Sequence, residues 1–121
     1  MVFNGQIIGA IKMGKFKDLD TAIQDYVDHL QDNYNTTASG QFVNFSYEVG
    51  RKYVHIIMNH FHHWDNTLTQ RSSHSFVMLA DDKKFKFGDI LKSASWKAPA
   101  RNFKRGNVLT GDFRNIRWCG V

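Results

Sequence analysis

A single helical stripe followed by short alternating runs limits this chain to a fold that combines one helix with a sheet. Large apolar residues in the stretch 18–33 recur at spacings of three and four: Leu19, Ile23, Tyr26, Val27 and Leu30. This spacing gathers them on one face of a helix. Asp18 and Asp20 stand near its start, where carboxylates accept hydrogen bonds from unpaired amides and face the positive end of the helix dipole. The sequence therefore predicts a helix over residues 18–33, ended by turn-forming residues up to Gly40.

Period-two alternation predicts the strands that follow the helix. The alternating runs cover residues 42–49, 51–61 and 73–80, with a short continuation over 85–87. Gly50 separates the first two runs and predicts a hairpin, and the Asp-Asp-Lys-Lys stretch at 81–84 predicts a tight turn. Residues 113–118 alternate more weakly and predict a short edge strand.

This order of elements predicts the fold class. One helix beside consecutive strands is typical of an α+β domain, in which an antiparallel sheet of four or five strands carries the helix on one face. The chain has 121 residues, so a single domain over 1–121 can bury its own core. The other face of the sheet is then polar, covered by a partner subunit, or a binding surface.

Charge is divided unevenly along the chain, whose formal net charge is +5. The predicted helix is acidic, whereas no acid occurs from Ile90 to Gly111. The basic residues of that acid-free stretch are Lys92, Lys97, Arg101, Lys104 and Arg105. A local excess of positive charge favours an anionic partner, such as a phosphate, a nucleotide or a nucleic acid.

The same stretch has the features of a phosphate-binding segment. Pro99 and Gly106 suit the two ends of a short helical turn, which would place Arg101 and Arg105 on one side. Two guanidinium forks aimed at one point match the oxygens of a phosphate. Trp96 either stacks on a base, which contributes roughly 1–3 kcal/mol, or anchors the core. The segment therefore predicts a ligand that contains phosphate.

The sequence gives no argument for catalysis, a cofactor or a metal. His60, His62 and His63 with Asp65 could ligate zinc, but their spacing matches no recognised metal motif and favours a solvated loop. Ser73 and His74 are neighbours on a predicted strand, so their side chains are expected on opposite faces and not in a hydrogen-bonded dyad. By the same alternation, Ser73 and Ser75 are expected to share a face.

Cysteine usage and hydropathy indicate the compartment. Cys119 is the single cysteine, is expected to be half-buried, and fits a reducing cytoplasm. Residues 1–16 lack the apolar run and cleavage site of a secretory signal. No stretch approaches the roughly 18 apolar residues of a membrane helix, so no membrane association is predicted.

One block of the sequence resembles a pattern of small tailed-phage proteins. The block, SHSFVMLADDKKFKFGDILKSASWKAPARNFKRGNV, covers about a third of the chain, and its Trp-Lys-Ala-Pro-Ala core is the most distinctive part. In size and layout the chain is also similar to the Thoeris anti-defence protein 1 family. Members of that family bind cyclised ADP-ribose immune signals without cleaving them, as homo-oligomers with ligands held where subunits meet.

This resemblance implies a set of site residues. Arg51, Phe76, Arg101 and Arg105 would fill the family's ligand-contacting places, and Lys92, Trp96 and Lys97 are added from the basic stretch. The implied function is a phage anti-defence protein that sequesters a cyclic ADP-ribose isomer or a cyclic oligonucleotide in the cytoplasm of the infected bacterial host. It would act as a homo-oligomer, a dimer or larger, without a cofactor.

A second function stays open at this point. The same basic and aromatic residues would suit a phage accessory protein that binds single-stranded nucleic acid. Steep loss of affinity with salt would distinguish that protein from one with a small-ligand pocket.

Overall fold

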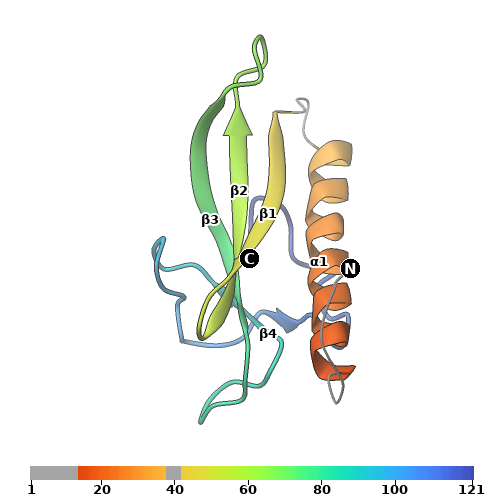
Figure 1. The fold of residues 1–121 in the computed structure, drawn as a ribbon, viewed down its shortest axis with the longest axis vertical. Helices are drawn as coiled ribbons and strands as arrows, with labels where there is room; N and C mark the ends of the chain where they lie inside the picture. The colour runs from red at the N-terminus through yellow and green to blue at the C-terminus, as the bar shows by residue number, and fades with distance from the viewer. Residues whose placement is uncertain (1–13, 38–41) are drawn as a thin grey trace.

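A computed structural model describes residues 14–37 and 42–121 of the chain and contains one helix and five strands in that part. The elements are α1 (Gly14–Thr37), β1 (Val43–Val49), β2 (Tyr53–Phe61), β3 (Leu68–Met78), β4 (Asp89–Lys92) and β5 (Gly106–Asn107). The strands form one antiparallel sheet in the order β1-β2-β3-β4-β5, and α1 runs alongside it (Figure 1). The predicted α+β class is confirmed.

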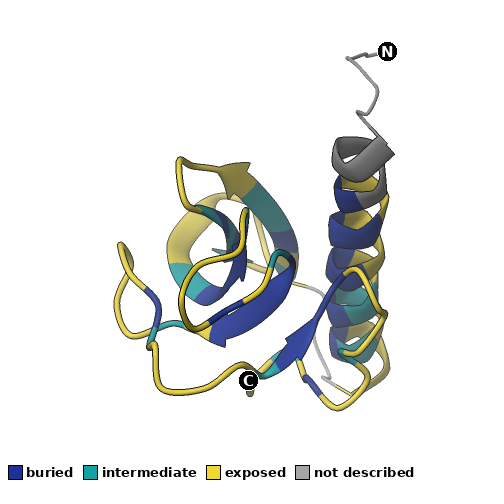
Figure 2. Cartoon of the chain, turned by 90° about the horizontal axis from the view of Figure 1, so that it is seen from below, coloured by how far each residue is buried: buried dark blue, intermediate teal, exposed yellow. Residues whose placement is uncertain are grey.

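The apolar stripe of α1 packs on one face of the sheet, as predicted. All of its members are buried: Leu19, Ile23, Tyr26, Val27 and Leu30. They share one core cluster with Phe45 of β1, Ile56 of β2 and Val77 of β3. Figure 2 shows this buried stripe turned toward the sheet, with the exposed side of α1 turned away. We refer to the opposite side of β1–β3 as the open face.

The predicted bounds of the helix are wrong at both ends. The helix begins at Gly14, so Asp18 and Asp20 lie within it and do not cap it, because no helix breaker occurs among residues 15–17. At the other end the hydroxyl of Thr37 donates to the carbonyl of Asn33, 2.6 Å away, which satisfies a carbonyl of the last turn. The helix therefore continues to Thr37, and the rest of the predicted turn, residues 38–40, lies outside the described residues.

A glutamine of α1 covers the outer edge of β1. The side-chain amide of Gln31 donates to the carbonyl of Val43 at 3.1 Å, and its oxygen accepts from the amide of Phe45 at 3.2 Å. These are backbone groups that the edge strand would otherwise leave unpaired. The contact holds α1 against β1 and blocks that edge to further strands.

An irregularity in β3 reverses the faces expected for its serines. Ile56 pairs with Ser75 while Ile57 pairs with Ser73, so His74 is an extra residue in the ladder. Ser75 consequently reaches Tyr26 of α1, whereas Ser73 reaches His55 on the open face. The prediction that the two serines share a face is wrong. Ser73 and His74 form no hydrogen-bonded dyad among the described contacts, and His74 bonds instead to the serine that follows it, Ser75.

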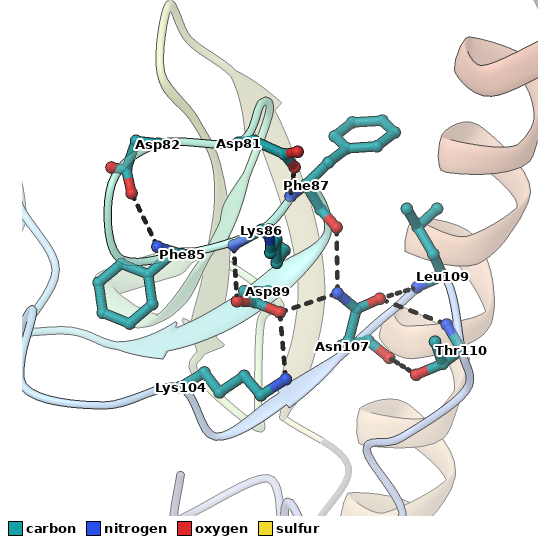
Figure 3. A network of polar contacts seen from close by, with 10 residues as sticks. All are labelled: Asp81, Asp82, Phe85, Lys86, Phe87, Asp89, Lys104, Asn107, Leu109 and Thr110. Atoms are coloured by element: carbon teal, nitrogen blue, oxygen red, sulfur yellow. Dashed lines mark hydrogen bonds and ion pairs between the residues drawn. The ribbon is translucent and has the colours of Figure 1, made fainter.

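Side chains replace strand pairing in the two short runs predicted as strands near the C-terminal end. Residues 85–87 form no strand, because the carboxylates of Asp82 and Asp81 accept from the amides of Phe85 and Phe87 (Figure 3). The turn predicted at 81–84 does lie there. Residues 113–118 form no strand either. Imidazole N–H groups of His29 and His74 donate to the carbonyls of Ile116 and Arg117.

The prediction about membranes is tested only in part of the chain. No helix in residues 14–37 and 42–121 combines the length and the apolar character that crossing a bilayer requires. The prediction that the first residues are not a secretory signal concerns a segment that lies largely outside the described residues.

Candidate functional site

Arg101 of the basic stretch forms an ion pair with a carboxylate of the same chain. The guanidinium of Arg101 donates to a carboxylate oxygen of Asp82 at 2.5 Å and to the hydroxyl of Tyr53 at 3.0 Å. The guanidinium carbon of Arg101 lies 4.9 Å from the centre of the Phe85 ring. The amides of Phe85 and Lys84, together with Arg101, lower the pKa of Asp82 to about 2. Asp82 is therefore ionised at neutral pH and holds Arg101 in place.

A second carboxylate fixes the middle of the same stretch. Asp89 is 2% exposed and accepts from the amide of Lys86 at 2.8 Å and from the side-chain amide of Asn107 at 2.9 Å. The ammonium of Lys104 lies 3.8 Å from this carboxylate (Figure 3). Lys84 adds a bond of 2.7 Å to the carbonyl of Arg101. Loop 81–89 thus anchors Arg101 and Lys104, which follow it in the sequence.

Arg101 and Arg105 do not converge, because the predicted helical turn over residues 100–106 is absent. The amides of Ala100 and Arg105 donate to the carbonyls of Lys92 and Ile90, each at 2.7 Å, so the segment runs along β4. Arg105 donates to the carbonyl of Val121 at 2.8 Å, and its guanidinium carbon lies 4.0 Å from the Phe103 ring. The two arginines therefore contact different groups.

The other predicted site residues are placed differently from one another. Phe76 is 3% exposed, with its ring stacked on His55 at 4.5 Å. Neither face of that ring is presented as an open surface. Arg51, Lys92 and Lys97 are exposed. Trp96 is 41% exposed and lies on the open face of the sheet, where it contacts His55 and Arg71, which are not among the predicted site residues.

We call these residues the open-face cluster: Glu48, His55, Arg71, Ser73, Ser93 and Trp96. Trp96 is presented by a tight loop, in which the amides of Ala94 and Ser95 both donate to the carbonyl of Ala98. The indole and the His55 ring pack edge to face with a centroid distance of 4.6 Å, and the Arg71 guanidinium carbon lies 5.4 Å from the indole centre. The loop thus places an exposed ring over the sheet.

Polar contacts fix the rest of the cluster. Nε2 of His55 lies 2.7 Å from the hydroxyl of Ser73, which also bonds to the hydroxyl of Ser93. Arg71 donates to Glu48 at 3.0 Å. Burial lowers the pKa of His55, with Arg71 acting in the same direction and Glu48 against it, so the imidazole is neutral at pH 7.

Together these contacts make one aromatic row across the open face, with an arginine at each end. In order, the row consists of Arg101, Tyr53, Phe76, His55, Trp96 and Arg71. Tyr53 and Phe76 meet at a centroid distance of 5.6 Å, which joins the half of the row near loop 81–89 to the half under Trp96. Interleaved rings and guanidinium groups are typical of surfaces that bind nucleotides and single-stranded nucleic acid.

Glu48, His55 and Arg71 are not among the site residues predicted from the sequence. A signal for them was present, because alternation in residues 42–49 and 51–61 puts Glu48 and His55 opposite the apolar positions that pack under the helix. Arg71 lies before the run predicted as the third strand, and β3 begins earlier, at Leu68. Its place on the open face could not be predicted without that longer strand.

The histidine-rich tip of the β2–β3 hairpin is held by ring contacts. His62 stacks on Trp64 at 4.7 Å, and His63 meets the same ring at 4.5 Å. His60 bonds to the hydroxyl of Ser72 at 2.8 Å. In the part of the chain that the structure describes, no three His, Cys, Asp or Glu side chains are grouped so that they could hold a metal ion.

Two further features lie away from the open-face cluster. Cys119 is exposed, so the prediction of a half-buried cysteine is wrong; the neighbouring Trp118 packs against Tyr34 instead. A groove of about 640 Å³ lies between α1 and residues 108–113, and none of its lining residues belongs to the predicted site.

Comparison with known proteins identifies a family without a known activity. A family model described as a family of unknown function, DUF7717, matches residues 9–120. No curated protein and no solved structure matches the chain.

Proposed function

The chain belongs to DUF7717, a family of unknown function, and we therefore propose its function from the geometry of the open face. We propose that it is a binding protein that holds a nucleotide-derived ligand on the open-face cluster without cleaving it. The observation that carries this proposal is the exposed indole of Trp96, set between His55 and Arg71 within an aromatic row.

The chemistry of the cluster supports a base and a phosphate as parts of the ligand. Stacking of a base on an exposed aromatic ring contributes roughly 1–3 kcal/mol. Lys97 follows Trp96 in the same loop and is exposed, and its ammonium group can neutralise phosphate oxygens beside a base stacked on Trp96. Lys92 is exposed too, but it pairs with Ser75, whose side chain reaches Tyr26 of α1, so Lys92 lies on the opposite face and does not join the cluster. Arg101 contributes less than its sequence position suggests, because Asp82 already occupies its guanidinium.

The polar contacts of His55 support binding rather than nucleophilic catalysis. A serine nucleophile needs a histidine base whose second nitrogen is oriented by a further group, commonly a carboxylate. His55 contacts Ser73 through Nε2, and no carboxylate among the described residues hydrogen-bonds to its Nδ1. The hydroxyl of Ser73 is moreover shared with Ser93. This arrangement suits a fixed polar surface.

The resemblance to the Thoeris anti-defence protein 1 family supports a narrower form of the proposal. In that form the ligand is a cyclic ADP-ribose isomer or a cyclic oligonucleotide made by a host defence system. The protein is then a phage anti-defence protein that sequesters the signal in the cytoplasm of the infected bacterium, as a homo-oligomer. A second copy would cover a cluster whose ring is 41% exposed in the single chain.

Calorimetric titration tests the proposal. The wild-type protein is titrated with cyclic ADP-ribose isomers, a cyclic dinucleotide and AMP, and the bound ligand is recovered after denaturation. We expect binding of at least one probe, recovered intact, and a loss of at least tenfold in affinity for Trp96→Ala. Trp64→Ala, at the hairpin tip, is the matched control and should bind normally. Recovery of a cleaved ligand, or equal affinity of the Trp96 variant, would contradict the proposal.

Single-stranded nucleic acid is the second candidate, favoured by one observation. Trp96, the exposed ring of the aromatic row, lies over a sheet face, and sheet faces with exposed rings are common platforms for unstacked bases. When several basic residues neutralise the phosphates of a nucleic-acid strand, counterions are released from it, so the affinity of the protein for the strand falls steeply between about 50 and 200 mM salt. A small ligand shows a far weaker slope. Titration of an oligonucleotide at both salt concentrations therefore separates the two candidates.

A further inference from the structure

The Glu48–Arg71 pair on the open face presents an acceptor and a donor side by side. The two side chains are 62% and 38% exposed, and Arg71 donates from one terminal nitrogen to one oxygen of Glu48 at 3.0 Å. The second carboxylate oxygen and the second terminal nitrogen make no hydrogen bond or ion pair with other described residues. A ligand group that both donates and accepts can satisfy both.

Neighbouring amides fix the direction of this pair. Nε of Arg71 donates to the side-chain oxygen of Asn59 at 3.3 Å. The amide nitrogen of Asn59 in turn donates to Asn44 and to Ser46, at 3.0 Å each. The side-chain nitrogen of Asn59 is therefore occupied by Asn44 and Ser46, and its side-chain oxygen fixes the Nε end of the Arg71 guanidinium. The groups of the pair that stay available belong to Glu48 and to the outer end of Arg71.

A vicinal diol complements this pair better than a phosphate does. Each hydroxyl donates one hydrogen bond and accepts others, so one hydroxyl can donate to Glu48 while its neighbour accepts from Arg71. A phosphate offers only acceptors at neutral pH and is repelled by the carboxylate. The pair also lies beside the ring site, since the Arg71 guanidinium carbon is 5.4 Å from the indole centre of Trp96. The base and the ribose of one nucleoside are likewise adjacent, so a base on Trp96 would place its ribose near the Glu48–Arg71 pair.

We infer that the Glu48–Arg71 pair binds the 2′,3′-diol of a ribose whose base stacks on Trp96, so that the protein selects ribonucleotides over 2′-deoxyribonucleotides. This inference rests on the proposed function and names the chemical class of its ligand. In a free ribonucleotide both hydroxyls of this diol are available. Inside an RNA strand the 3′-oxygen is esterified, so only the 2′-hydroxyl can donate to Glu48, and the complete diol occurs only at the 3′ end. The test below separates these two sources.

The test compares AMP with 2′-deoxy-AMP, and an oligoriboadenylate with the matching oligodeoxyadenylate, by calorimetry on the full chain. A hydrogen bond to a charged group predicts about 10- to 100-fold tighter binding of the ribose form. Glu48→Gln removes the charge with little change of shape but keeps an acceptor oxygen, so it should reduce this ratio to a few fold. Asp20→Asn, which removes an exposed carboxylate of α1, is the control and should keep the ratio. Preference within the mononucleotide pair identifies a free nucleotide as the source, and preference within the oligomers alone identifies RNA.

The outcomes separate the two proposals. Equal affinity for the ribose and deoxyribose forms, or a ratio unchanged by Glu48→Gln, overturns the diol inference and leaves the proposed nucleotide site standing. Binding of none of these four probes and of no cyclic ADP-ribose isomer overturns both. Melting temperatures of the variants confirm that they are folded, since Glu48 is exposed and its replacement removes no core contact.

Discussion

His74 and Ser75, consecutive residues of β3, hydrogen-bond to each other in the core, with Nδ1 and Oγ 2.9 Å apart. The direction of this bond follows from its neighbours. The carbonyl of Arg117 only accepts, so the proton of His74 is on Nε2, 2.9 Å from that oxygen. Nδ1 then accepts from Ser75, whose oxygen accepts from the hydroxyl of Tyr26 at 2.8 Å. The hydroxyls of Tyr26 and Ser75 and both ring nitrogens of His74 all have a hydrogen-bond partner in this arrangement only while His74 is neutral.

This chain of bonds predicts that folding stability falls with acid. Burial lowers the pKa of His74, although the bond to the Arg117 carbonyl opposes this, so the unfolded chain binds a proton that the folded chain resists. The contribution is complete above the ordinary histidine pKa of about 6.5 and is lost as pH falls below it, by at most about 1.4 kcal/mol per pH unit. Urea unfolding between pH 7.5 and 5.0 measures this slope.

His74→Gln and His63→Gln are the variants for that measurement. His63 lies at the exposed hairpin tip, so its replacement should keep the wild-type slope. Replacement of His74 should flatten the slope, whatever it does to stability at pH 7.5. A slope that is the same in the His74 variant and the wild type would assign the acid sensitivity to other groups.

Removal of Ser75 should destabilise the fold more than removal of the Tyr26 hydroxyl. Ser75→Ala leaves two buried groups without a partner, the hydroxyl of Tyr26 and Nδ1 of His74, which should cost about 2 kcal/mol or more. Tyr26→Phe removes the outer donor alone and should cost about 1 kcal/mol. Denaturant unfolding at pH 7.5 gives both free energies. The reverse order would show that the bonds do not run in the direction derived above.

Replacement of Asp82 should release the basic stretch. Asp82→Asn removes the charge that holds Arg101, so residues 101–105 should become more accessible to protease. Trypsin should then cut after Arg101 and Lys104 several times faster than in the wild type. Cleavage after the exposed Arg51 serves as an internal control, and Asp20→Asn serves as the control variant. Uniform acceleration at all sites would indicate global destabilisation and contradict a local role for Asp82.

Periodicity predicted the elements whose faces are decided locally. The stripe from Leu19 to Leu30 packs as expected, and β1 lies within one residue of its predicted bounds, because helix and strand periods depend on neighbours in sequence. The faces on which Ser73 and Ser75 lie depend on the pairing of β3 with β2. In that pairing His74 is an extra residue, so the side chains of β3 that precede it point to the opposite faces from those that strict alternation predicts. A period-two pattern carries no sign of that shift.

The candidate site was harder to predict because long-range contacts assign its charges. The acid-free stretch predicts a surface for an external anion, yet Asp82 and Asp89, from an earlier loop, already contact Arg101 and Lys104. Trp96 is exposed beside Arg71, whereas the sequence left open whether it would anchor the core, and its role in binding stays a prediction. That Arg71 lies beside Trp96 could not be predicted from the sequence, because it depends on the length and register of β3.

Close approach of two backbones at β5 predicts a severe effect of a single methyl group. A Cβ at Gly106 would lie closer than 3.0 Å to the backbone oxygen of Asp112, and that oxygen is fixed because it accepts from the amide of Asn107 at 2.9 Å. Gly106→Ala should therefore lower the free energy of unfolding by about 2 kcal/mol or more, as overpacking against backbone does. Gly120→Ala, whose Cβ would meet no atom within 4 Å, is the control and should be nearly neutral. Denaturant unfolding of both variants measures the difference, and equal stabilities would mean that the Asn107–Asp112 bridge can open without cost.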